Sequence, residues 1–356
     1  MRWDIFCQIV DNYGDAGVCW RLARSLSSIH GQEVRIFCDD LPTLNLLASG
    51  VDPATKGQIE LLPWEASHHN ARHPTQTPDV VIEAFGCELP ERYLAGLYIA
   101  AVKPIIINLE YLSAEPWVTE FHGKASPQSH GIPKYFFFPG FQEAVGGLLL
   151  DPIPQIGAIV AKHIPEDLKA IWAKLRPNAK RISIFCYPGA PLRKWLSDLG
   201  VNGEEVDVLL AHGHEELLNV YGERQLNLPS NIQIHSMPFV SQDEYDWVLS
   251  QCDFNIVRGE DSFIRAQLAG KPFIWHIYPQ EDRAHEVKLA AFLDLYLEEA
   301  NQALRLATIA AMTWAPPREW FGNLESWSTH ATLWRAHLLE KQGDGGLPAR
   351  LLRFAS

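Results

Sequence analysis

Positive charge and long apolar stretches are both scarce in this sequence. Its 356 residues carry 30 Lys and Arg against 43 Asp and Glu, a formal net charge of −13. That balance argues against non-specific nucleic-acid binding, which depends on clustered cations that displace counterions from phosphate. The chain reaches Asp4 before any extended apolar run begins, so we expect neither a secretory signal nor a membrane-spanning helix.

Metal-binding and hydrolase motifs are also missing. The six cysteines, at positions 7, 19, 38, 87, 186 and 252, form no C-x-x-C pair. The histidines at 68–69 and in the segment 212–214 lack cysteine or carboxylate partners at ligand spacing, and no G-x-S-x-G turn occurs. We expect the thiols to be buried and reduced, as in a cytoplasmic protein.

What the sequence does contain is a regular alternation of strands and helices. Strands that are apolar on both faces and separated by helix-length segments are typical of parallel sheets built from βα units. Ten such runs occur, at residues 3–10, 33–39, 59–64, 79–86, 103–112, 181–188, 206–213, 232–239, 253–259 and 271–279. The fold class is therefore α/β.

The ten runs form two groups, on either side of a proline-rich connection at residues 148–180. We predict two Rossmann-like, doubly wound domains, residues 1–155 and 156–335, that face a central cleft at the carboxyl ends of their strands. Residues 336–356, the end of a helix and a tail, are a candidate to pack back on the N-terminal domain.

Near the C-terminus, apolar side chains recur at spacings of four and three and predict one face of a core helix. They are Trp320, Leu324, Trp327, Ala331, Trp334 and Leu338.

The turn after the first strand, DNYGDAG at residues 11–17, carries two aspartates. We expect a helix to begin near Ala16, with one aspartate explained as its N-cap. The other, at the carboxyl end of a strand, is a candidate catalytic residue. The pattern is not G-x-G-x-x-G, and the carboxylates of Asp11 and Asp15 would repel a pyrophosphate. This domain therefore suits the acceptor side of a transfer reaction.

The junction RGEDS, residues 258–262, combines several devices of an anion site. An apolar strand ends at Arg258 and Gly259, and the helix that follows offers its N-terminal N–H groups to a diphosphate. The guanidinium of Arg258 and the hydroxyl of Ser262 add further donors. The alternative is structural: Ser262 or Asp261 caps the helix, and Arg258 pairs with Glu260.

Four aromatic residues lie at the ends of neighbouring strands or just beyond them. Taken singly, such side chains are usually core residues. Because their strands flank the diphosphate candidate, stacking on a nucleobase is the functional interpretation. The four are Phe185, Tyr187, Phe239 and Tyr245.

Several stretches together resemble one family over nearly the full chain. They are WDIFCQIVDNYGDAGVCWRLARSL, INLEYLSAE, KYFFFPGF, IFCYPGAP, CDFNIVRGEDSFIRAQLAGKPFIWHIYPQED and the tryptophan-rich final helix. They are similar to the EarP-type protein-arginine rhamnosyltransferases of bacteria. The resemblance implies a GT-B glycosyltransferase fold. It also implies that rhamnose moves from dTDP-β-L-rhamnose to one arginine of translation elongation factor P, with inversion at the sugar carbon. No metal or other cofactor is implied.

The resemblance also implies roles for individual residues. The acidic residues essential in the family match Asp11, Asp15 and Glu260. Tyrosine occupies position 245, where the family often has phenylalanine, and it preserves stacking. The thymidine would be surrounded by Phe185, Tyr187, Phe239, Gln242 and Tyr245, and the diphosphate would be held by Arg258, Asp261 and Ser262.

This reaction explains the two aspartates, because its acceptor is a guanidinium that stays protonated and that two carboxylates can grip. We expect Asp15 to accept the proton late, as the C–N bond forms, and Asp11 to orient the guanidinium. Glu260 would position the rhamnose or the acceptor. Glu110 and Tyr111, at another strand end, are candidates for acceptor contact, with strand-end packing as the alternative.

Two other functions stay open. One is a GT-B transferase that uses another nucleotide sugar or a small-molecule acceptor. The other is a non-catalytic protein that binds elongation factor P or a nucleotide, although a binding module needs no acidic trio beside a phosphate site.

Overall fold

The computed structural model describes residues 1–11, 13–49, 58–67, 77–128, 131–150, 164–201, 203–214 and 228–356. The chain divides into two compact units. Unit 1 joins Met1–Asp151 to Glu340–Ser356, and unit 2 is Pro152–Leu339. The predicted boundary between residues 155 and 156 falls in a segment outside the described residues, as does the histidine pair at 68–69.

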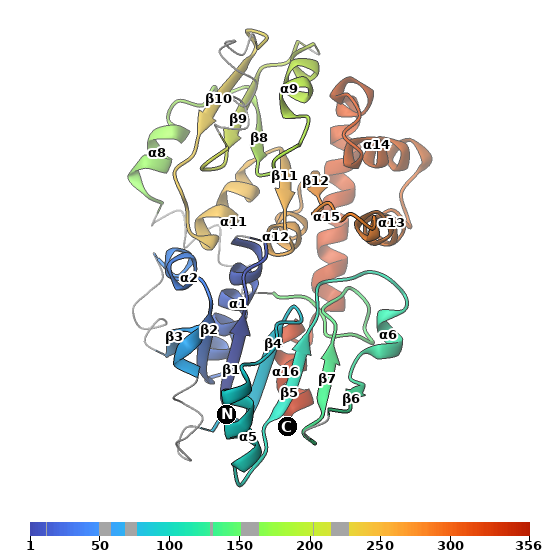
Figure 1. The fold of residues 1–356 in the computed structure, drawn as a ribbon. Coiled ribbons are helices and arrows are strands. Elements are labelled where there is room, and N and C mark those ends of the chain that lie inside the picture. The colour runs from blue at the N-terminus through green and yellow to red at the C-terminus, as the bar shows by residue number, and fades with distance from the viewer. Residues whose placement is uncertain are drawn as a thin grey trace. The chain divides into compact units, whose positions relative to one another are not determined.

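Unit 1 is built on a seven-stranded sheet with the order β3-β2-β1-β4-β5-β7-β6 (Figure 1). Neighbouring strands are parallel except for β6 and β7. Its helices and strands are β1 (Arg2–Cys7), α1 (Tyr13–Arg24), the π-helical turn η1 (Ser25–Ile29), β2 (Glu33–Cys38), α2 (Leu41–Leu47), β3 (Ile59–Pro63), the 3₁₀ turn η2 (Trp64–Ala66), β4 (Val80–Ala84), α5 (Glu91–Ile99), β5 (Ile105–Leu109), α6 (Val118–Phe121), β6 (Ala125–Ser126), β7 (Lys134–Phe137) and, from the end of the chain, α16 (Gly346–Ala355).

Unit 2 is built on a five-stranded parallel sheet with the order β10-β9-β8-β11-β12. Its helices and strands are α8 (Glu166–Trp172), β8 (Lys180–Ile184), α9 (Leu192–Gly200), β9 (Val206–Leu210), β10 (Ile232–Ser236), α11 (Gln242–Gln251), β11 (Phe254–Arg258), α12 (Asp261–Ala269), β12 (Phe273–His276), α13 (Ala284–Tyr296), α14 (Gln302–Met312), the 3₁₀ turns η5 (Pro317–Glu319) and η6 (Phe321–Asn323), and α15 (Leu324–Lys341), whose last residues belong to unit 1.

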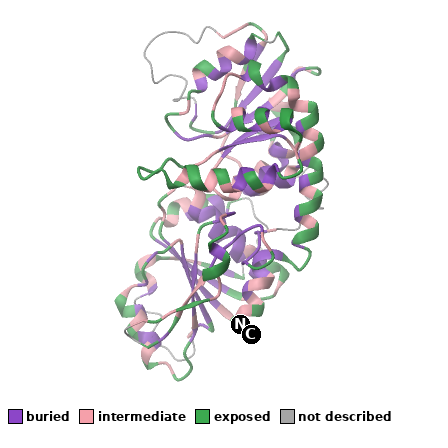
Figure 2. Ribbon diagram, turned by 90° about the vertical axis from the view of Figure 1, so that its right-hand side faces the viewer, coloured by how far each residue is buried: buried purple, intermediate pink, exposed green. Residues whose placement is uncertain are grey.

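The strands form where the sequence is apolar on both faces. Strands β4 and β9 are buried along their whole length, and Figure 2 shows buried strands in both sheets. Each of the ten predicted runs overlaps one strand, which confirms the α/β class with two parallel sheets. Strands β6 and β7 were not predicted. Strand β6 has only two residues, and only Phe137 of β7 is buried, so neither forms a run that is apolar on both faces.

Two details of the predicted helices are wrong. Helix α1 begins at Tyr13 rather than near Ala16, because the Gly14 N–H already donates to the carbonyl of Asp11 at 2.6 Å. Trp320 lies between two 3₁₀ turns rather than on α15. It is nevertheless fully buried, stacked on Phe254 with ring centroids 5.1 Å apart. Apolar periodicity therefore identified Trp320 as a core residue but placed the start of the helix too early.

The strand orders create a topological switch point in each sheet. In unit 1 the chain runs outward from β1 through β2 to β3 and then returns to pair β4 on the other side of β1. In unit 2 it runs from β8 through β9 to β10 and returns to pair β11 on the other side of β8. Open parallel sheets bind ligands beyond the carboxyl ends of the strands at such points. The segments after β1 and β4 are therefore the candidate site of unit 1, and those after β8 and β11 are the candidate site of unit 2.

The last residues of the chain complete unit 1. Leu347 and Leu351 of α16 are buried, and the ring of Phe354 packs edge-on against Tyr135 and Phe137 of β7. The guanidinium of Arg350 donates to the carbonyl of Val145 at 2.7 Å. The sheet face near β7 is thus closed by a helix that is distant in sequence.

The six cysteines are buried and free, which confirms the expected reduced thiols. Among the helices that the structure describes, none has the length and apolar character needed to cross a membrane.

Candidate functional site

The switch point of unit 1 is occupied by the two aspartates of the DNYGDAG turn. Asp15 lies in the first turn of α1, and its side chain is almost fully buried. Its Oδ2 atom accepts hydrogen bonds from the backbone N–H groups of Val10 at 2.8 Å and Asp11 at 2.9 Å. The carboxylate of Asp15 therefore holds the segment that carries Asp11.

Gly14 leaves the space that the Asp11 carboxylate occupies. A Cβ atom at residue 14 would lie 2.6 Å from Oδ2 of Asp11, closer than any unstrained contact. Because glycine is a poor residue in a helix interior, its presence in α1 is explained by this close approach. The turn thus brings the two predicted carboxylates to the end of β1.

The segment after β4 adds a strained aromatic residue that the sequence analysis missed. Phe85 has a left-handed backbone with φ of 58°, a conformation rarely held by a bulky side chain without tertiary support. Its N–H donates to the carbonyl of Leu109 at 2.7 Å, and its ring stacks on Tyr111 with centroids 4.6 Å apart. The neighbouring Glu110 accepts a hydrogen bond from Asn108 at 2.6 Å, and burial raises the pKa of its carboxyl.

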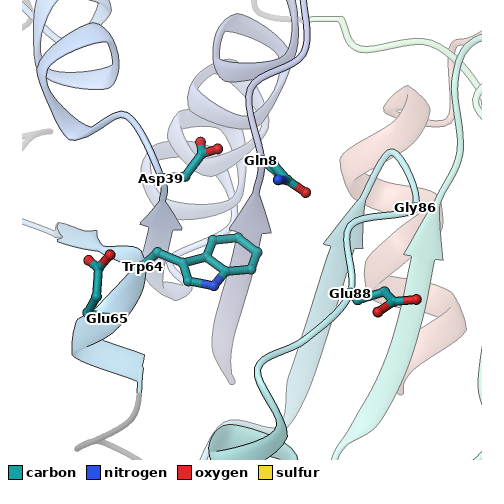
Figure 3. A pocket seen from close by; sticks show the side chains of 6 residues that line it. All are labelled: Gln8, Asp39, Trp64, Glu65, Gly86 and Glu88. Atoms are coloured by element: carbon teal, nitrogen blue, oxygen red, sulfur yellow. The ribbon is translucent and has the colours of Figure 1, made fainter.

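A pocket of about 440 Å³ opens among the ends of β1, β2, β3 and β4. Figure 3 shows the indole of Trp64 in its wall, with carboxylates on the surrounding segments. The predicted site residues are absent from its lining. The lining residues are Gln8, Asp39, Trp64, Glu65, Gly86 and Glu88.

In unit 2 the structure brings Arg258 together with two predicted aromatic residues. The guanidinium carbon lies 4.5 Å from the ring centroid of Phe185 and 4.8 Å from that of Tyr187. The ring of Tyr245 approaches Phe185 edge-on, with centroids 5.8 Å apart. These residues come from the segments after β8, at the end of β11 and in α11, so the fold alone makes them neighbours.

The RGEDS junction has the predicted strand-to-helix geometry. Gly259 has a positive φ of 66°, and α12 begins at Asp261. Oδ2 of Asp261 accepts a hydrogen bond from Nε2 of Gln242 at 3.0 Å, which ties α12 to the first residue of α11. Ser262 is half-buried in the first turn.

Glu260 has a partner other than the one considered from sequence. Lys288 of α13 donates from Nζ to Oε1 of Glu260 at 2.7 Å, and both side chains are mostly buried. Phe239 packs against His212, with ring centroids 6.5 Å apart. The roles of Glu260 and Phe239 stay predictions, as do those of the other site residues.

A buried ion pair fixes the two helices that carry much of this site. Arg265 of α12 and Asp246 of α11 are joined at 2.6 Å, with side chains 2% and 4% exposed. Removing one partner of such a pair leaves an uncompensated buried charge, so α11 and α12 are firmly coupled. Within the described ranges, no group of three or more His, Cys, Asp or Glu side chains is placed to hold a metal ion.

Comparison with known proteins identifies the family. A family model described as Elongation-Factor P (EF-P) rhamnosyltransferase EarP matches residues 3–356. A protein-arginine rhamnosyltransferase of Pseudomonas putida is 38% identical over 365 residues, covering 94% of each chain. One of Pseudomonas aeruginosa is 37% identical over 375 residues, covering 99% of this chain and 98% of that one.

Solved structures agree with the sequence relatives. One that describes EarP-mediated arginine glycosylation of translation elongation factor EF-P has a TM-score of 0.64 at 28% identity, covering 99% of this chain and 98% of that chain. CalG4, the calicheamicin glycosyltransferase, and MurG of Acinetobacter baumannii each have a TM-score of 0.51, at 14% and 12% identity. These neighbours confirm the GT-B fold. The chain belongs to the EarP family of elongation-factor P rhamnosyltransferases.

Proposed function

We propose that this chain transfers L-rhamnose from dTDP-β-L-rhamnose to an arginine side chain of translation elongation factor P, with inversion at the sugar carbon. The observation that carries the proposal is the opposite character of the two switch points. The one in unit 2 has a guanidinium over aromatic rings, whereas the one in unit 1 has two aspartates. The first suits an anionic nucleotide, and the second suits a cationic acceptor.

On the donor side, Phe185, Tyr187, Phe239, Gln242 and Tyr245 would surround the thymidine. Arg258 would bind the diphosphate with charge-assisted hydrogen bonds. Backbone N–H groups at the start of α12 and the hydroxyl of Ser262 would add donors. Asp261 would act through Gln242, which already donates to its carboxylate.

On the acceptor side, Asp11 and Asp15 would hold the guanidinium of the target arginine. One oxygen of Asp15 already accepts two backbone N–H groups, so we assign the incoming proton to the other oxygen. The further carboxylates of the same sheet edge, Asp39, Glu65 and Glu88, favour the approach of a basic protein surface.

The chemical step is a displacement at C1 of the rhamnose. A guanidinium nitrogen attacks C1 on the face opposite the nucleotide, and the bond between C1 and the diphosphate oxygen breaks. That oxygen takes the electron pair as dTDP leaves, and the attacking nitrogen loses one proton to Asp15. A carboxylate is a far weaker base than a free guanidine and cannot deprotonate a guanidinium before it reacts. The proton therefore moves late, when bonding to carbon has lowered the basicity of the nitrogen.

We assign Glu260 to positioning the rhamnose or the acceptor, with Lys288 holding its carboxylate in place. The charge on the leaving dTDP would be balanced by Arg258 and by the α12 N-terminus. These groups can supply the stabilisation that a metal ion provides elsewhere, so the proposed reaction uses no resident metal or cofactor. Since the acceptor is a translation factor, the reaction would take place in the cytoplasm.

The test is the intact mass of purified elongation factor P after incubation with this protein. Parallel reactions contain dTDP-rhamnose, dTDP-glucose or UDP-glucose, each with and without EDTA. We expect a gain of one deoxyhexose, only with dTDP-rhamnose, unaffected by EDTA and mapped to an arginine by peptide fragmentation.

The other outcomes separate the alternatives. A gain of mass with another nucleotide sugar would replace the donor. No gain despite calorimetric binding of dTDP would favour a small-molecule acceptor or a non-catalytic binding protein. Absence of dTDP binding by the folded protein would contradict the donor site itself.

A further inference from the structure

The segment after β8 carries two rings of the proposed donor site beyond the end of the sheet. The N–H of Phe185 still donates to a neighbouring strand, to the carbonyl of Ile256 at 2.8 Å. The next two N–H groups, of Cys186 and Tyr187, donate instead to histidine ring nitrogens. The path of this backbone therefore depends on side chains from other elements.

The two histidines differ in what they offer. Nε2 of His214, in the segment after β9, lies 3.1 Å from the N–H of Cys186 and 2.8 Å from its carbonyl, and a given tautomer satisfies one of these groups. Nδ1 of His276, the last residue of β12, accepts from the N–H of Tyr187 at 3.0 Å. This second bond requires a ring with a lone pair on Nδ1.

The bond needs a neutral His276 ring whose proton lies on Nε2, and the first of these conditions follows from the pKa of the ring. Burial, and secondly the charge of Arg258, lower the pKa of His276 to about 4. The imidazole is thus neutral at neutral pH. Its ring also lies edge-on to Tyr187, with centroids 5.4 Å apart, and to Trp314, with centroids 5.2 Å apart.

Tyr187 in turn provides one of the two rings that the guanidinium of Arg258 contacts. The guanidinium is over both Tyr187 and Phe185, and these rings stand on either side of Cys186 in the same short segment. A cation–π contact weakens quickly with distance, so a displaced main chain at Tyr187 would separate the guanidinium from its rings. Tyr187 is thus linked on one side to His276 by a hydrogen bond and on the other to Arg258 by a cation–π contact.

We propose that His276 is a positioning residue of the donor site. By accepting the N–H of Tyr187 at Nδ1, it holds the 185–187 segment so that both rings lie beneath the guanidinium of Arg258. This inference rests on the proposed function only in taking that cluster as the donor site. His276 itself is assigned no contact with the sugar and no part in the chemical step.

Two variants of the full chain separate the hydrogen bond from the ring. His276→Asn keeps an acceptor near the position of Nδ1, whereas His276→Phe keeps a ring and loses the acceptor. The control is His330→Phe, because the His330 ring is also half-buried in unit 2 and bonds a backbone group, the carbonyl of Tyr296 at 2.8 Å.

The first measurement is amide hydrogen exchange over residues 185–187. We expect exchange at the Tyr187 amide to be at least about tenfold faster in His276→Phe, as for the loss of one buried hydrogen bond. His276→Asn and His330→Phe should keep most of the protection. Equal protection in His276→Phe and the wild type would overturn the proposal.

The second measurement is binding of dTDP by calorimetry, with steady-state transfer alongside. We expect the Kd for dTDP and the KM for the donor to rise about tenfold in His276→Phe, kcat to change by less than about threefold, and His276→Asn to recover most of the affinity. Equal losses of dTDP affinity in the two His276 variants would mean that the residue contributes only to core packing, and would contradict the assignment.

Two further outcomes are distinguishable. If the wild type binds no dTDP, the proposed donor is wrong, while hydrogen exchange still decides the role of His276. If His276→Phe does not fold, the ¹⁵N shift of His276 Nδ1 in the wild type decides it, because an accepting, unprotonated nitrogen is required. A protonated Nδ1 at pH 7 would overturn the proposal.

Discussion

Individual side chains of the candidate site contact its own backbone or aromatic rings as well as being proposed to bind ligands. Asp15 accepts two backbone N–H groups through one oxygen, and Arg258 lies over two rings on the neighbouring segment. A substitution that tests chemistry must therefore keep the structural contact. Asparagine at position 15 keeps an acceptor oxygen, and lysine at position 258 keeps the charge.

For Asp15→Asn we expect transfer to fall by about 10² to 10⁴, the usual cost of losing a general base. The Kd for dTDP should stay within about twofold, since all the proposed donor residues belong to unit 2. Transfer is measured by intact mass and donor binding by calorimetry. The matched control is Asp40→Asn, because Asp40 also accepts a backbone N–H near the start of a helix, from Thr43 at 3.1 Å. Loss of dTDP binding in Asp15→Asn would refute its assignment.

For Arg258→Lys we expect dTDP to bind about tenfold more weakly. Lysine retains the charge but loses the planar stacking over Phe185 and Tyr187 and the forked donors. Calorimetric titration with dTDP measures the change. The exposed Arg283, paired with Glu286 on α13, provides the control Arg283→Lys. Unchanged affinity in Arg258→Lys would mean that its charge alone recognises the nucleotide.

At the scale of elements, the start of α1 is where sequence and fold conflict. A glycine in the first turn weakens the helix, yet the Asp11 carboxylate can lie where it does only if position 14 has no Cβ. Gly14 therefore lowers the helix propensity of α1 but allows the Asp11 carboxylate to lie at the switch point.

For Gly14→Ala we expect transfer to fall at least about tenfold while stability barely changes. Alanine favours the helix by up to about 1 kcal/mol, but its Cβ would displace the Asp11 carboxylate, and small misplacements of a substrate-holding group are costly. The unfolding midpoint and transfer rate are measured together. Gly322→Ala is the control, since no atom lies within 4 Å of its added Cβ. Full activity in Gly14→Ala would show that Asp11 need not lie there.

At the scale of the whole molecule, unit 1 is assembled from both ends of the chain. The C-terminal helix α16 buries Leu347 and Leu351 and contributes hydrogen bonds from Arg350. Residues more than two hundred positions upstream thus depend on the final helix for part of their core.

For Leu351→Ala we expect the free energy of unfolding of unit 1 to fall by about 2–4 kcal/mol, the cost of a cavity at a buried leucine. Two units allow two unfolding transitions, so calorimetry on the full chain should show only one of them moving. Leu333→Ala, which truncates a leucine 65% exposed on α15, should leave both transitions in place. A Leu351→Ala protein as stable as the wild type would mean that α16 is not part of the core.

Acid should destabilise the protein through a half-buried histidine in each unit. Burial, with Arg350 as the second cause, lowers the pKa of His122 to about 4, and burial with Arg258 does the same to His276. The unfolded chain, with a histidine pKa of about 6.5, then binds more protons between pH 6.5 and 4. Stability therefore rises with pH in that window and is lost as the pH falls through it.

The measurement is the unfolding midpoint from pH 7.5 to 4.5 at constant ionic strength. His122→Asn should flatten the pH dependence, because its amide can replace Nδ1 as the acceptor of the Phe138 N–H without titrating. A slope identical to that of the wild type would show that His122 contributes nothing to it.

Much of the fold could be read from local patterns. Continuous apolar runs predicted each main strand, because a strand covered on both faces must be apolar throughout. Motif chemistry also led to the aspartates near β1 and the cation at the end of β11. The place of Trp320 could not be predicted, since it depends on stacking with Phe254, which is distant along the chain. The start of α1 was missed for a local reason: the hydrogen bond from Gly14 to the carbonyl of Asp11 leaves no trace in the apolar pattern.

The sequence by itself determined the α/β class, the two groups of strands and the residue types that chemistry at the site would use. Only the tertiary structure decided which of them meet: Arg258 with two rings, Gln242 with Asp261, Lys288 with Glu260, and His276 with the N–H of Tyr187. The physical reason is that periodicity and turn chemistry act over a few residues. Strand order, which no short stretch encodes, determines which segments lie next to one another at each switch point.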